Sequence, residues 1–213
     1  MLLLRSLPLT RRRRAQDAME RASEEFPGTT FTVNWHPYFL DVTLESKGLS
    51  KRDNYRGKGM DDRALEKMER GMAQNFAGEG IEYSLDGDTG NTVDSHRLAA
   101  WTYSKFGAEA QDKLIEVMFR KFFGPQSGEP TGGNPADHMM LLSAAEEALN
   151  GVDLDEVKEF LEGEVGRQQV RTQPARHLFA ANRRHTAGPE PDDHTAANGA
   201  GAQVLENAHA LMT

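Results

Sequence analysis

The chain has 213 residues, a formal net charge of −8 at pH 7 and no cysteine. This length suits one globular domain, or a domain with an inserted subdomain, and is enough to bury a sizeable core. The acidic balance argues against general nucleic-acid binding, and no apolar run approaches the ~18 residues that a transmembrane helix needs. Without cysteine, these residues cannot supply a disulfide, a thiolate nucleophile or cysteine-ligated zinc. We expect a soluble protein.

The N-terminal stretch Met1–Arg14 is basic, and no acidic residue precedes Asp17. A mitochondrial presequence has this character, whereas a secretory signal places its basic residues before its apolar run. A frayed terminus that leads into a helix is the simpler interpretation. We therefore expect a cytoplasmic protein, with a mitochondrial location as the alternative. The helix should run from Arg11 to about Phe26, with Thr10 as its N-cap.

The next elements alternate between extended and helical patterns. Phe31–His36 alternates with period two and predicts a strand that ends at Pro37, with His36 on its solvated face. A polar loop over residues 41–60 should follow. Asp61 then predicts the N-cap of a second helix.

The segment from Asp86 to Phe123 predicts two adjacent helices that are separated at Gly107. The first carries residues at helical spacing: Leu98, Ala99, Thr102, Tyr103 and Phe106. The second repeats the pattern: Leu114, Val117, Met118 and Phe122. Because such broad apolar faces must be buried, we expect this pair of helices to form the centre of the core.

His96 and Arg97 lie at the start of the first of these helices, which Asn91 or Asp94 would cap. A histidine can exchange protons near neutral pH, and an arginine can bind a carboxylate such as that of glutathione or of a peptide terminus. We therefore regard His96 and Arg97 as candidate substrate-binding residues. The structural alternative is that Arg97 fixes a neighbouring loop and that His96 caps the helix or forms an internal hydrogen bond.

Two further helices are predicted after a Gly/Pro-rich connection. Asn134 and Pro135 stand in the favoured order of cap and proline at a helix start. Asp153 and Glu156 resemble a capping box. His138 has no evident partner and is interpreted as a surface residue.

Residues 172–213 differ in composition, with one Val and no Ile, Tyr or Trp. Strands favour β-branched and aromatic residues, so we expect a poorly structured tail with at most a short helix over residues 204–212. Four of the seven histidines fall in the tail, but their spacing relative to Asp192 and Asp193 matches no metal-binding template. No residue pattern in the chain requires a metal or a cofactor.

The ordered motifs of the central segment resemble a known family. Asn91-Thr-x-x-x-His96-Arg97-Leu, then Trp101 and an apolar helix that ends in a double aromatic, is similar to the helical insert of DsbA-like proteins of the FrnE type. That group is related to 2-hydroxychromene-2-carboxylate isomerases and kappa-class glutathione transferases. The resemblance covers roughly residues 11–170.

The resemblance implies an α/β, α-rich chain: an incomplete thioredoxin-like fold dominated by a DsbA-type helical insert. The DsbA-like domain would span residues 1–171, with the insert over about residues 61–163 and the tail over residues 172–213. Phe31–His36 would be the second strand of the thioredoxin sheet. Asn91 and Trp35 join His96 and Arg97 as substrate-binding candidates.

The chain departs from the family at both ends. Family members place a strand and a Cys-Pro-x-Cys motif before the first helix, and the matching positions here fall near Leu4 and Leu7. Leucine cannot form the attacking thiolate, so we assign no catalytic residue. The family's cis-proline turn and last strands also lack a clear counterpart. We expect both ends to be altered and the sheet to be incomplete.

Three functions follow as alternatives. The first is a thiol–disulfide oxidoreductase by descent that has lost dithiol exchange. The second is a glutathione-dependent isomerase or transferase, for which Ser6 is the nearby serine, although it lacks the Ser-Pro motif of those relatives. The third is a non-catalytic interaction module. The expected partner is a peptide or a glutathione-like thiol, not a nucleic acid or a membrane, and the oligomeric state stays open.

Overall fold

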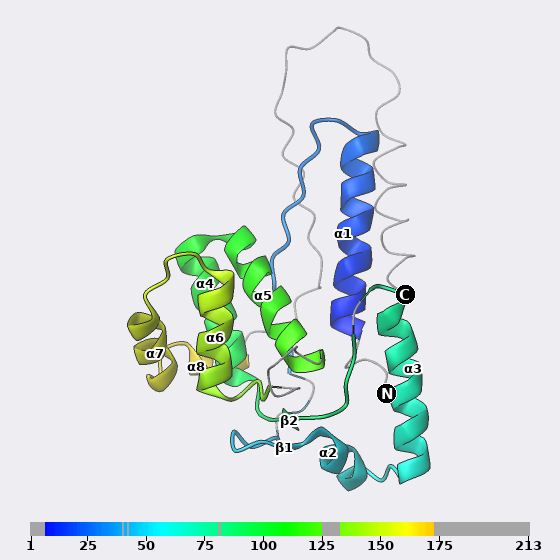
Figure 1. Cartoon of the computed structure of the whole chain (residues 1–213). Coiled ribbons are helices and arrows are strands. Elements are labelled where there is room, and N and C mark those ends of the chain that lie inside the picture. The colour runs from blue at the N-terminus through cyan, green and yellow to red at the C-terminus, as the bar shows by residue number, and fades with distance from the viewer. Residues whose placement is uncertain (1–6, 40, 42, 81, 125–132, 173–213) are drawn as a thin grey trace, which may run out of the picture. The chain divides into compact units, whose positions relative to one another are not determined.

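The computed structural model describes residues 7–39, 41, 43–80, 82–124 and 133–172 (Figure 1). The chain forms two compact units, residues 1–32 with 181–213 and residues 33–180, which are described separately. In the first unit the structure describes the helix α1 (Leu7–Glu25), which confirms the helix expected near Arg11–Phe26. The predicted helix over residues 204–212 and most of the predicted tail lie outside the described residues. No helix in the described part is long and apolar enough to cross a membrane.

The second unit contains a small antiparallel ribbon of two strands. These strands, β1 (Leu49–Ser50) and β2 (Asp88–Thr89), pair Leu49 with Thr89 and Ser50 with Asp88. Between them lie α2 (Lys51–Gly57) and α3 (Asp62–Ala77). The ribbon is the only strand pairing among the described residues. The expected loop over residues 41–60 is therefore partly wrong, because its second half forms β1 and α2.

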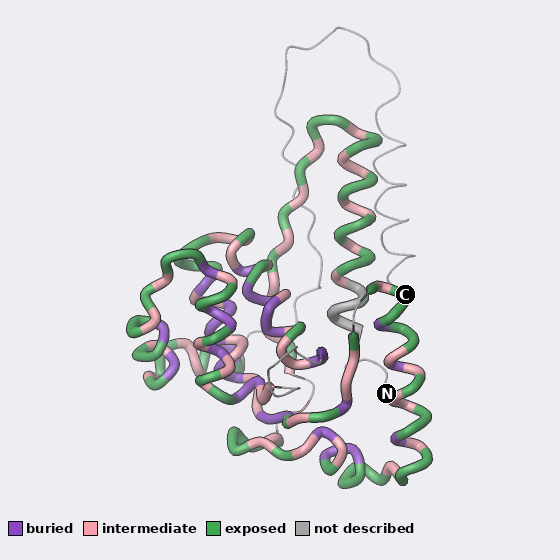
Figure 2. The backbone as a smooth tube through the Cα atoms, in the orientation of Figure 1, coloured by how far each residue is buried: buried purple, intermediate pink, exposed green. Residues whose placement is uncertain are grey.

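Five further helices lie in the described part of this unit. They are α4 (Val93–Phe106), α5 (Ala108–Phe123), α6 (His138–Ala148), α7 (Leu154–Glu162) and α8 (Arg167–Thr172). Helix α4 packs against the other four, and α5 packs against α6. Their shared core includes Leu98, Leu114, Leu141, Val157 and Leu161. In Figure 2 the buried residues gather on the facing sides of these helices. The predicted central pair of helices is confirmed.

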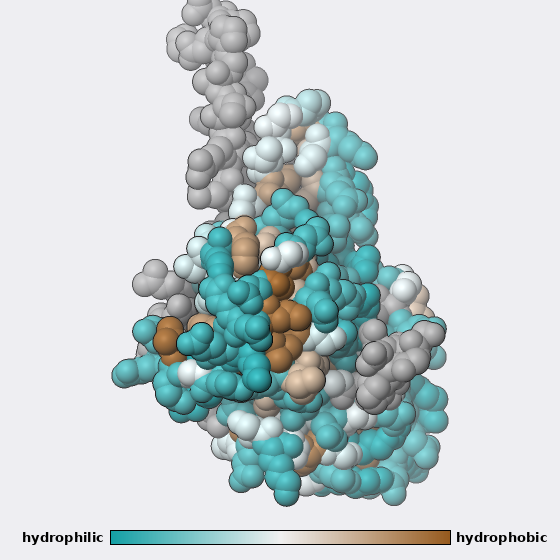
Figure 3. Space-filling model, turned by 60° about the vertical axis from the view of Figure 1, so that its left-hand side comes forward, coloured by the Kyte–Doolittle hydropathy of each residue, from teal (hydrophilic) through white to brown (hydrophobic). Residues whose placement is uncertain are grey.

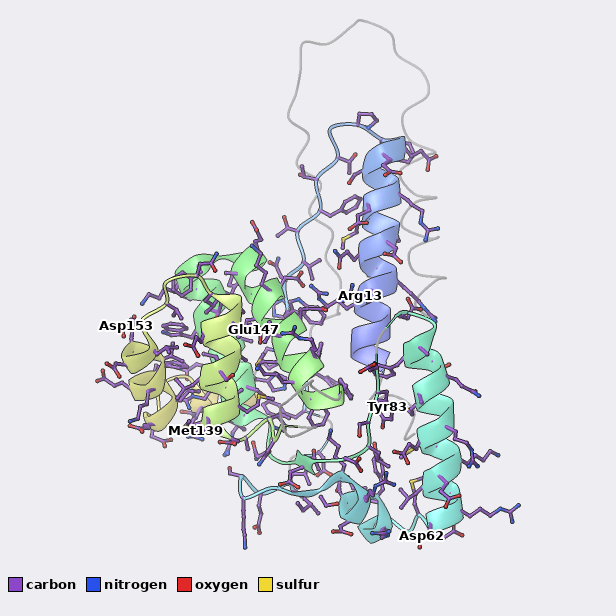
Figure 4. All side chains as sticks on the ribbon, viewed as in Figure 1. Arg13, Asp62, Tyr83, Met139, Glu147 and Asp153 are labelled. Atoms are coloured by element: carbon purple, nitrogen blue, oxygen red, sulfur yellow. The ribbon has the colours of Figure 1, made fainter. Side chains whose placement is uncertain are left out.

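Polar side chains cover much of the molecular face that Figure 3 shows. Figure 3 shows a face that is mostly hydrophilic around a small hydrophobic area, in keeping with a chain of which 27 % is charged. On α6, Glu147 (labelled in Figure 4) pairs with Arg120 and Lys121 of α5. Exposed ion pairs of this kind each contribute at most about 1 kcal/mol, so the apolar interior holds the helices together.

Several helix boundaries follow from local sequence. Asp61 caps α3, because its side chain accepts a hydrogen bond from the backbone N–H of Ala64 at 2.7 Å. Asp153 caps α7 in the same way, through the backbone N–H groups of Asp155 and Glu156. The second half of the predicted capping box does not form, since the Glu156 carboxylate pairs with Lys105 instead. Gly107 separates α4 from α5 with a φ of 86°, a conformation that favours glycine.

The predicted start of α6 at Asn134 and Pro135 is wrong. The helix begins at His138, and the Asp137 side chain caps it by accepting a hydrogen bond from the Met139 N–H at 2.9 Å. The Asn134 side chain accepts a hydrogen bond from the Ala136 N–H at 3.0 Å, within the turn before the helix, and donates to the carbonyl of Ser46 at 3.3 Å. The contact with Ser46 fixes a loop that is 88 residues away in the sequence, and the local sequence does not reveal it.

The predicted strand at Phe31–His36 does not form a ladder in the described part of the chain. The segment is extended, and half-buried and exposed residues alternate over residues 31–39. The period-two pattern therefore predicts the alternating burial of this segment correctly. It does not predict sheet formation, because a strand also needs a neighbouring strand with which to form hydrogen bonds.

Candidate functional site

The four predicted binding residues, Trp35, Asn91, His96 and Arg97, all lie in the unit of residues 33–180. Each has its own set of partners, and these sets come from different parts of the unit. Of the positions that match the family's cysteines, Leu4 lies outside the described residues and Leu7 is the first residue of α1.

Trp35 is held against α5 by its backbone and its ring. Its N–H donates to Gln111 Oε1 at 2.9 Å, and Gln111 Nε2 donates to the Trp35 carbonyl at 3.1 Å. The indole Nε1–H donates to Asp112 Oδ1 at 2.8 Å, and the ring meets Phe119 edge-to-face with centroids 6.0 Å apart. The Gln111 side chain is 2 % exposed, so a buried amide satisfies the backbone of this extended segment.

Asn91 joins the start of α4 to a loop. Its side chain accepts a hydrogen bond from the Val93 N–H at 2.8 Å and donates to the Leu44 carbonyl at 3.0 Å. Its backbone N–H donates to the Glu45 carbonyl at 3.1 Å. One residue thus fixes both the first turn of the helix and the position of residues 44–45.

His96 packs against the extended segment. Its ring meets Phe39 edge-to-face, with centroids 4.9 Å apart, and forms a hydrogen bond with the backbone of Tyr38. Burial lowers the pKa of His96 to about 4, although the bond to Tyr38 opposes this shift. The imidazole is therefore neutral at pH 7, and proton exchange near neutral pH does not suit this histidine.

Arg97 is 1 % exposed and forms five hydrogen bonds. Four go to carbonyls around the end of α7: Phe160, Leu161, Gly163 and Val165. The fifth goes from Nη1 to Asp94 Oδ1 at 2.6 Å. A guanidinium has five N–H donors, so all of them are used within the chain. In this conformation Arg97 has no donor to offer a carboxylate ligand.

Asp94 links Arg97 to two other helices. Its Oδ2 lies 3.1 Å from His138 Nε2 of α6 and 3.3 Å from Arg167 Nη2 of α8. Burial by itself would raise the pKa of Asp94, but the hydrogen bonds from Arg97 and His138 and the charge of Arg167 lower it overall. The interpretation of His138 as a surface residue without a partner is therefore wrong. Its partner lies on another helix, out of reach of local sequence patterns.

Lys51 is, beside Arg97, a buried cation that the sequence did not indicate. It is 5 % exposed, and its Nζ donates to the carbonyls of Asp86, at 3.2 Å, and Phe122. The ammonium also lies 4.3 Å from the centroid of the Phe122 ring. Burial lowers the pKa of Lys51 to about 8, against the opposing charges of Asp86 and Asp88. In the sequence this lysine is one of several in a polar stretch, and nothing distinguishes it from its solvated neighbours.

The described part of this unit also has an open hollow of about 490 Å³, lined by Glu164, Arg167, Gln168 and Arg171. None of the four predicted binding residues lines it. The structure therefore gathers the polar residues of the family motif into internal contacts, and not around this hollow.

The model of the DSBA-like thioredoxin domain matches residues 13–178 of the chain. This match covers most of the sequence, and the chain belongs to the DSBA-like thioredoxin family. A crystal structure of a probable DsbA oxidoreductase from Streptomyces coelicolor is similar, with a TM-score of 0.60 and 21 % sequence identity. The similarity covers 78 % of this chain and 67 % of that one, and at this identity it shows the fold alone. No curated protein sequence matched the chain. The predicted α-rich, DsbA-like thioredoxin fold is confirmed.

We predict that Arg97→Leu lowers the free energy of unfolding by about 3–5 kcal/mol, because it leaves the Asp94 carboxylate and the α7 carbonyls without their donor. Urea unfolding followed by circular dichroism measures the effect. The matched control is Arg120→Leu, which removes an exposed ion pair with Glu147 and should cost at most about 1 kcal/mol. Equal effects of the two substitutions would contradict a structural role for the buried guanidinium.

We predict that His96 makes the fold sensitive to acid. Its pKa of about 4 in the folded state lies below the ordinary value of 6.5. Between these values the unfolded state binds more protons, so stability is full above pH 6.5 and falls as the pH approaches 4. The loss relative to His96→Gln should be at most about 3 kcal/mol. Urea unfolding at a series of pH values tests this, with exposed His36→Gln as the control. Parallel pH profiles for wild type and His96→Gln would refute the assignment.

Proposed function

We propose that this chain is a DsbA-family protein that does not perform dithiol exchange. The observation that carries the proposal is the combination of a family match over residues 13–178 with a sequence of 213 residues that contains no cysteine. Thiol–disulfide exchange proceeds by attack of a thiolate on a disulfide sulfur. Neither serine nor any other side chain in the chain can replace the sulfur in that step. The family's redox chemistry therefore has no nucleophile in these residues.

We infer that the chain acts instead as a non-catalytic interaction module for a peptide. The contacts of the motif residues support this choice over a glutathione site. Among the four motif candidates only Arg97 carries a charge that could bind the carboxylates of glutathione, and its five N–H donors are all bonded to Asp94 and to backbone carbonyls. A peptide can be bound through its backbone and needs no such cation. We place the protein in the cytoplasm, with the mitochondrion as the alternative suggested by the basic stretch Met1–Arg14.

The first test is an insulin-reduction assay with the purified chain and dithiothreitol. We expect the same rate of insulin precipitation as in a blank without protein, because the chain has no cysteine thiolate to carry electrons from dithiothreitol to insulin. A dithiol DsbA-like protein at equal concentration serves as the positive control. A rate above the blank, at a protein concentration at which the control is active, would overturn the proposal.

The glutathione alternative is tested by isothermal titration calorimetry. We expect no heat of binding with reduced glutathione at millimolar concentration. A saturable heat that Ser6→Ala abolishes would favour the isomerase or transferase function, since Ser6 is the serine nearest to the family's first cysteine position. Ser6 lies outside the described residues, so the titration and not the geometry decides this alternative.

A further inference from the structure

The C-terminal half of α4 carries two aromatic rings that lie beside a carboxylate of α7. We call Trp101, Phe106 and Glu156 the aromatic corner; Phe106 is 43 % exposed and Trp101 is half-buried. The label of Asp153 in Figure 4 marks the end of α7 at which Glu156 lies. We propose that the aromatic corner binds an arginine side chain of a partner peptide, in exchange for Lys105 of the same chain. This inference deepens the proposed peptide-binding function and rests on it.

The rings of the aromatic corner are held in place by the fold. Trp101 and Phe106 meet edge-to-face, with their centroids 5.7 Å apart. The Trp101 ring also stacks on Phe160 of α7, with centroids 5.6 Å apart. Both Trp101 and Phe160 pack against the apolar core of the helices. The indole is therefore fixed before a partner arrives, and little conformational entropy is left to lose on binding.

A cation of the chain itself occupies the aromatic corner. Lys105 Nζ lies 5.0 Å from the centroid of the Trp101 ring and 5.5 Å from that of the Phe106 ring. The same ammonium pairs with the Glu156 carboxylate. Aromatic faces attract a cation within about 6 Å of their centroids, because the ring quadrupole is negative there. The internal lysine thus identifies the chemistry of the ligand, which is a positively charged side chain.

Lys105 can leave the aromatic corner at a small cost. Its side chain is 38 % exposed and that of Glu156 is 44 % exposed. Exposed ion pairs and exposed cation–π contacts are weak, because water competes for the charges. After release the ammonium stays at the last turn of α4, where the helix dipole favours a cation. A ligand therefore displaces a weakly held side chain and leaves the core contacts intact.

An arginine side chain suits the aromatic corner better than the lysine that it replaces. A planar guanidinium stacks on an indole and can bond a carboxylate through two parallel N–H donors, whereas an ammonium is a point charge. The net charge of −8 and the acidic first turn of α7, with Asp155 and Glu156, also attract a basic peptide. A neutral or acidic peptide gains none of these contacts.

NMR spectroscopy of the indole N–H groups tests the site, because the chain has two tryptophans. The ligands are acetyl-Ala-Arg-Ala-amide and the same peptide with citrulline, which has nearly the shape of arginine but no charge. We expect the arginine peptide alone to shift the Trp101 signal, which Trp101→Phe assigns. The Trp35 signal should stay in place, since its N–H is bonded to Asp112.

Two outcomes of this titration would overturn the proposal. Equal binding of both peptides would show a site that does not recognise the charge, and the peptide-binding function would stand with another site. No shift of Trp101 at millimolar arginine peptide, even in Lys105→Ala, would overturn the aromatic corner alone. The peptide-binding function would survive that result, because it does not require an arginine in the ligand.

Substitution of the internal lysine tests the exchange. Lys105→Ala removes the competing ammonium and should tighten the binding of the arginine peptide about three- to tenfold. The matched control is Lys113→Ala, which removes an exposed lysine of α5 that pairs with Glu109 and so changes the net charge equally. Its affinity should equal that of the wild type. A Lys105→Ala variant that binds no tighter than Lys113→Ala would contradict the exchange.

Two further pairs of variants test the ring and the carboxylate. Phe106→Ala and Glu156→Gln should each weaken binding about threefold or more, because each removes one side of the aromatic corner. The control Tyr103→Ala removes a ring of the same turn that is 46 % exposed and has no described contact with Trp101. The control Glu159→Gln removes the same charge from α7. Circular dichroism checks the fold of all variants, and equal losses in variants and controls would refute the site.

Discussion

The buried guanidinium of Arg97 is the constraint that decides how the helices around the apolar interior meet. A charge that is 1 % exposed is tolerated only when hydrogen bonds and an opposite charge compensate for the lost water. Here Asp94 supplies the charge, and four carbonyls around the end of α7 supply the acceptors. These carbonyls belong to a helix end, where intrahelical partners are missing. One side chain therefore fixes α4 against α7, and through Asp94 it reaches His138 on α6 and Arg167 on α8.

The same contacts show that the family motif has a structural role in this chain. The motif residues with which the resemblance begins are Asn91, His96 and Arg97. Each of them uses its polar atoms for contacts within the fold. Asn91 holds the loop of residues 44–45, His96 packs on Phe39, and Arg97 caps α7. Residues with such roles can persist in a chain that has no thiol chemistry, because the helices need them whether or not a cysteine is present. The residues that identify the chain as a family member are therefore not the cysteines that carry out the family's redox reaction.

The extended segment at Val33–Phe39 shows how helices can hold a strand-like element without a ladder. Gln111 satisfies the backbone of Trp35 from inside the bundle, and Asp112 and Phe119 fix its ring. Burial of one side gives the alternation that the sequence displays, although no strand pairs with this segment among the described residues. A segment can therefore take the conformation of a strand without joining a sheet. Among the described residues, Val33–Phe39 is extended but pairs with no other strand.

The sequence by itself determined the helices α1, α3, α4, α5 and α7, the core face of α4 and α5 and the exclusion of thiolate chemistry, whereas α2 and α8 were not predicted. These features depend on neighbours three or four residues apart, on caps such as Asp61 and Asp153, or on composition alone. Only the tertiary structure decided the partner of His138 and the burial of Lys51. It also decided that the alternating segment Phe31–His36 packs on helices and forms no sheet among the described residues. His138 meets Asp94 across 44 residues of sequence, and Lys51 meets Phe122 across 71. No periodicity encodes such distances, because they arise when separate helices pack, and packing also decides which polar groups are left for a partner.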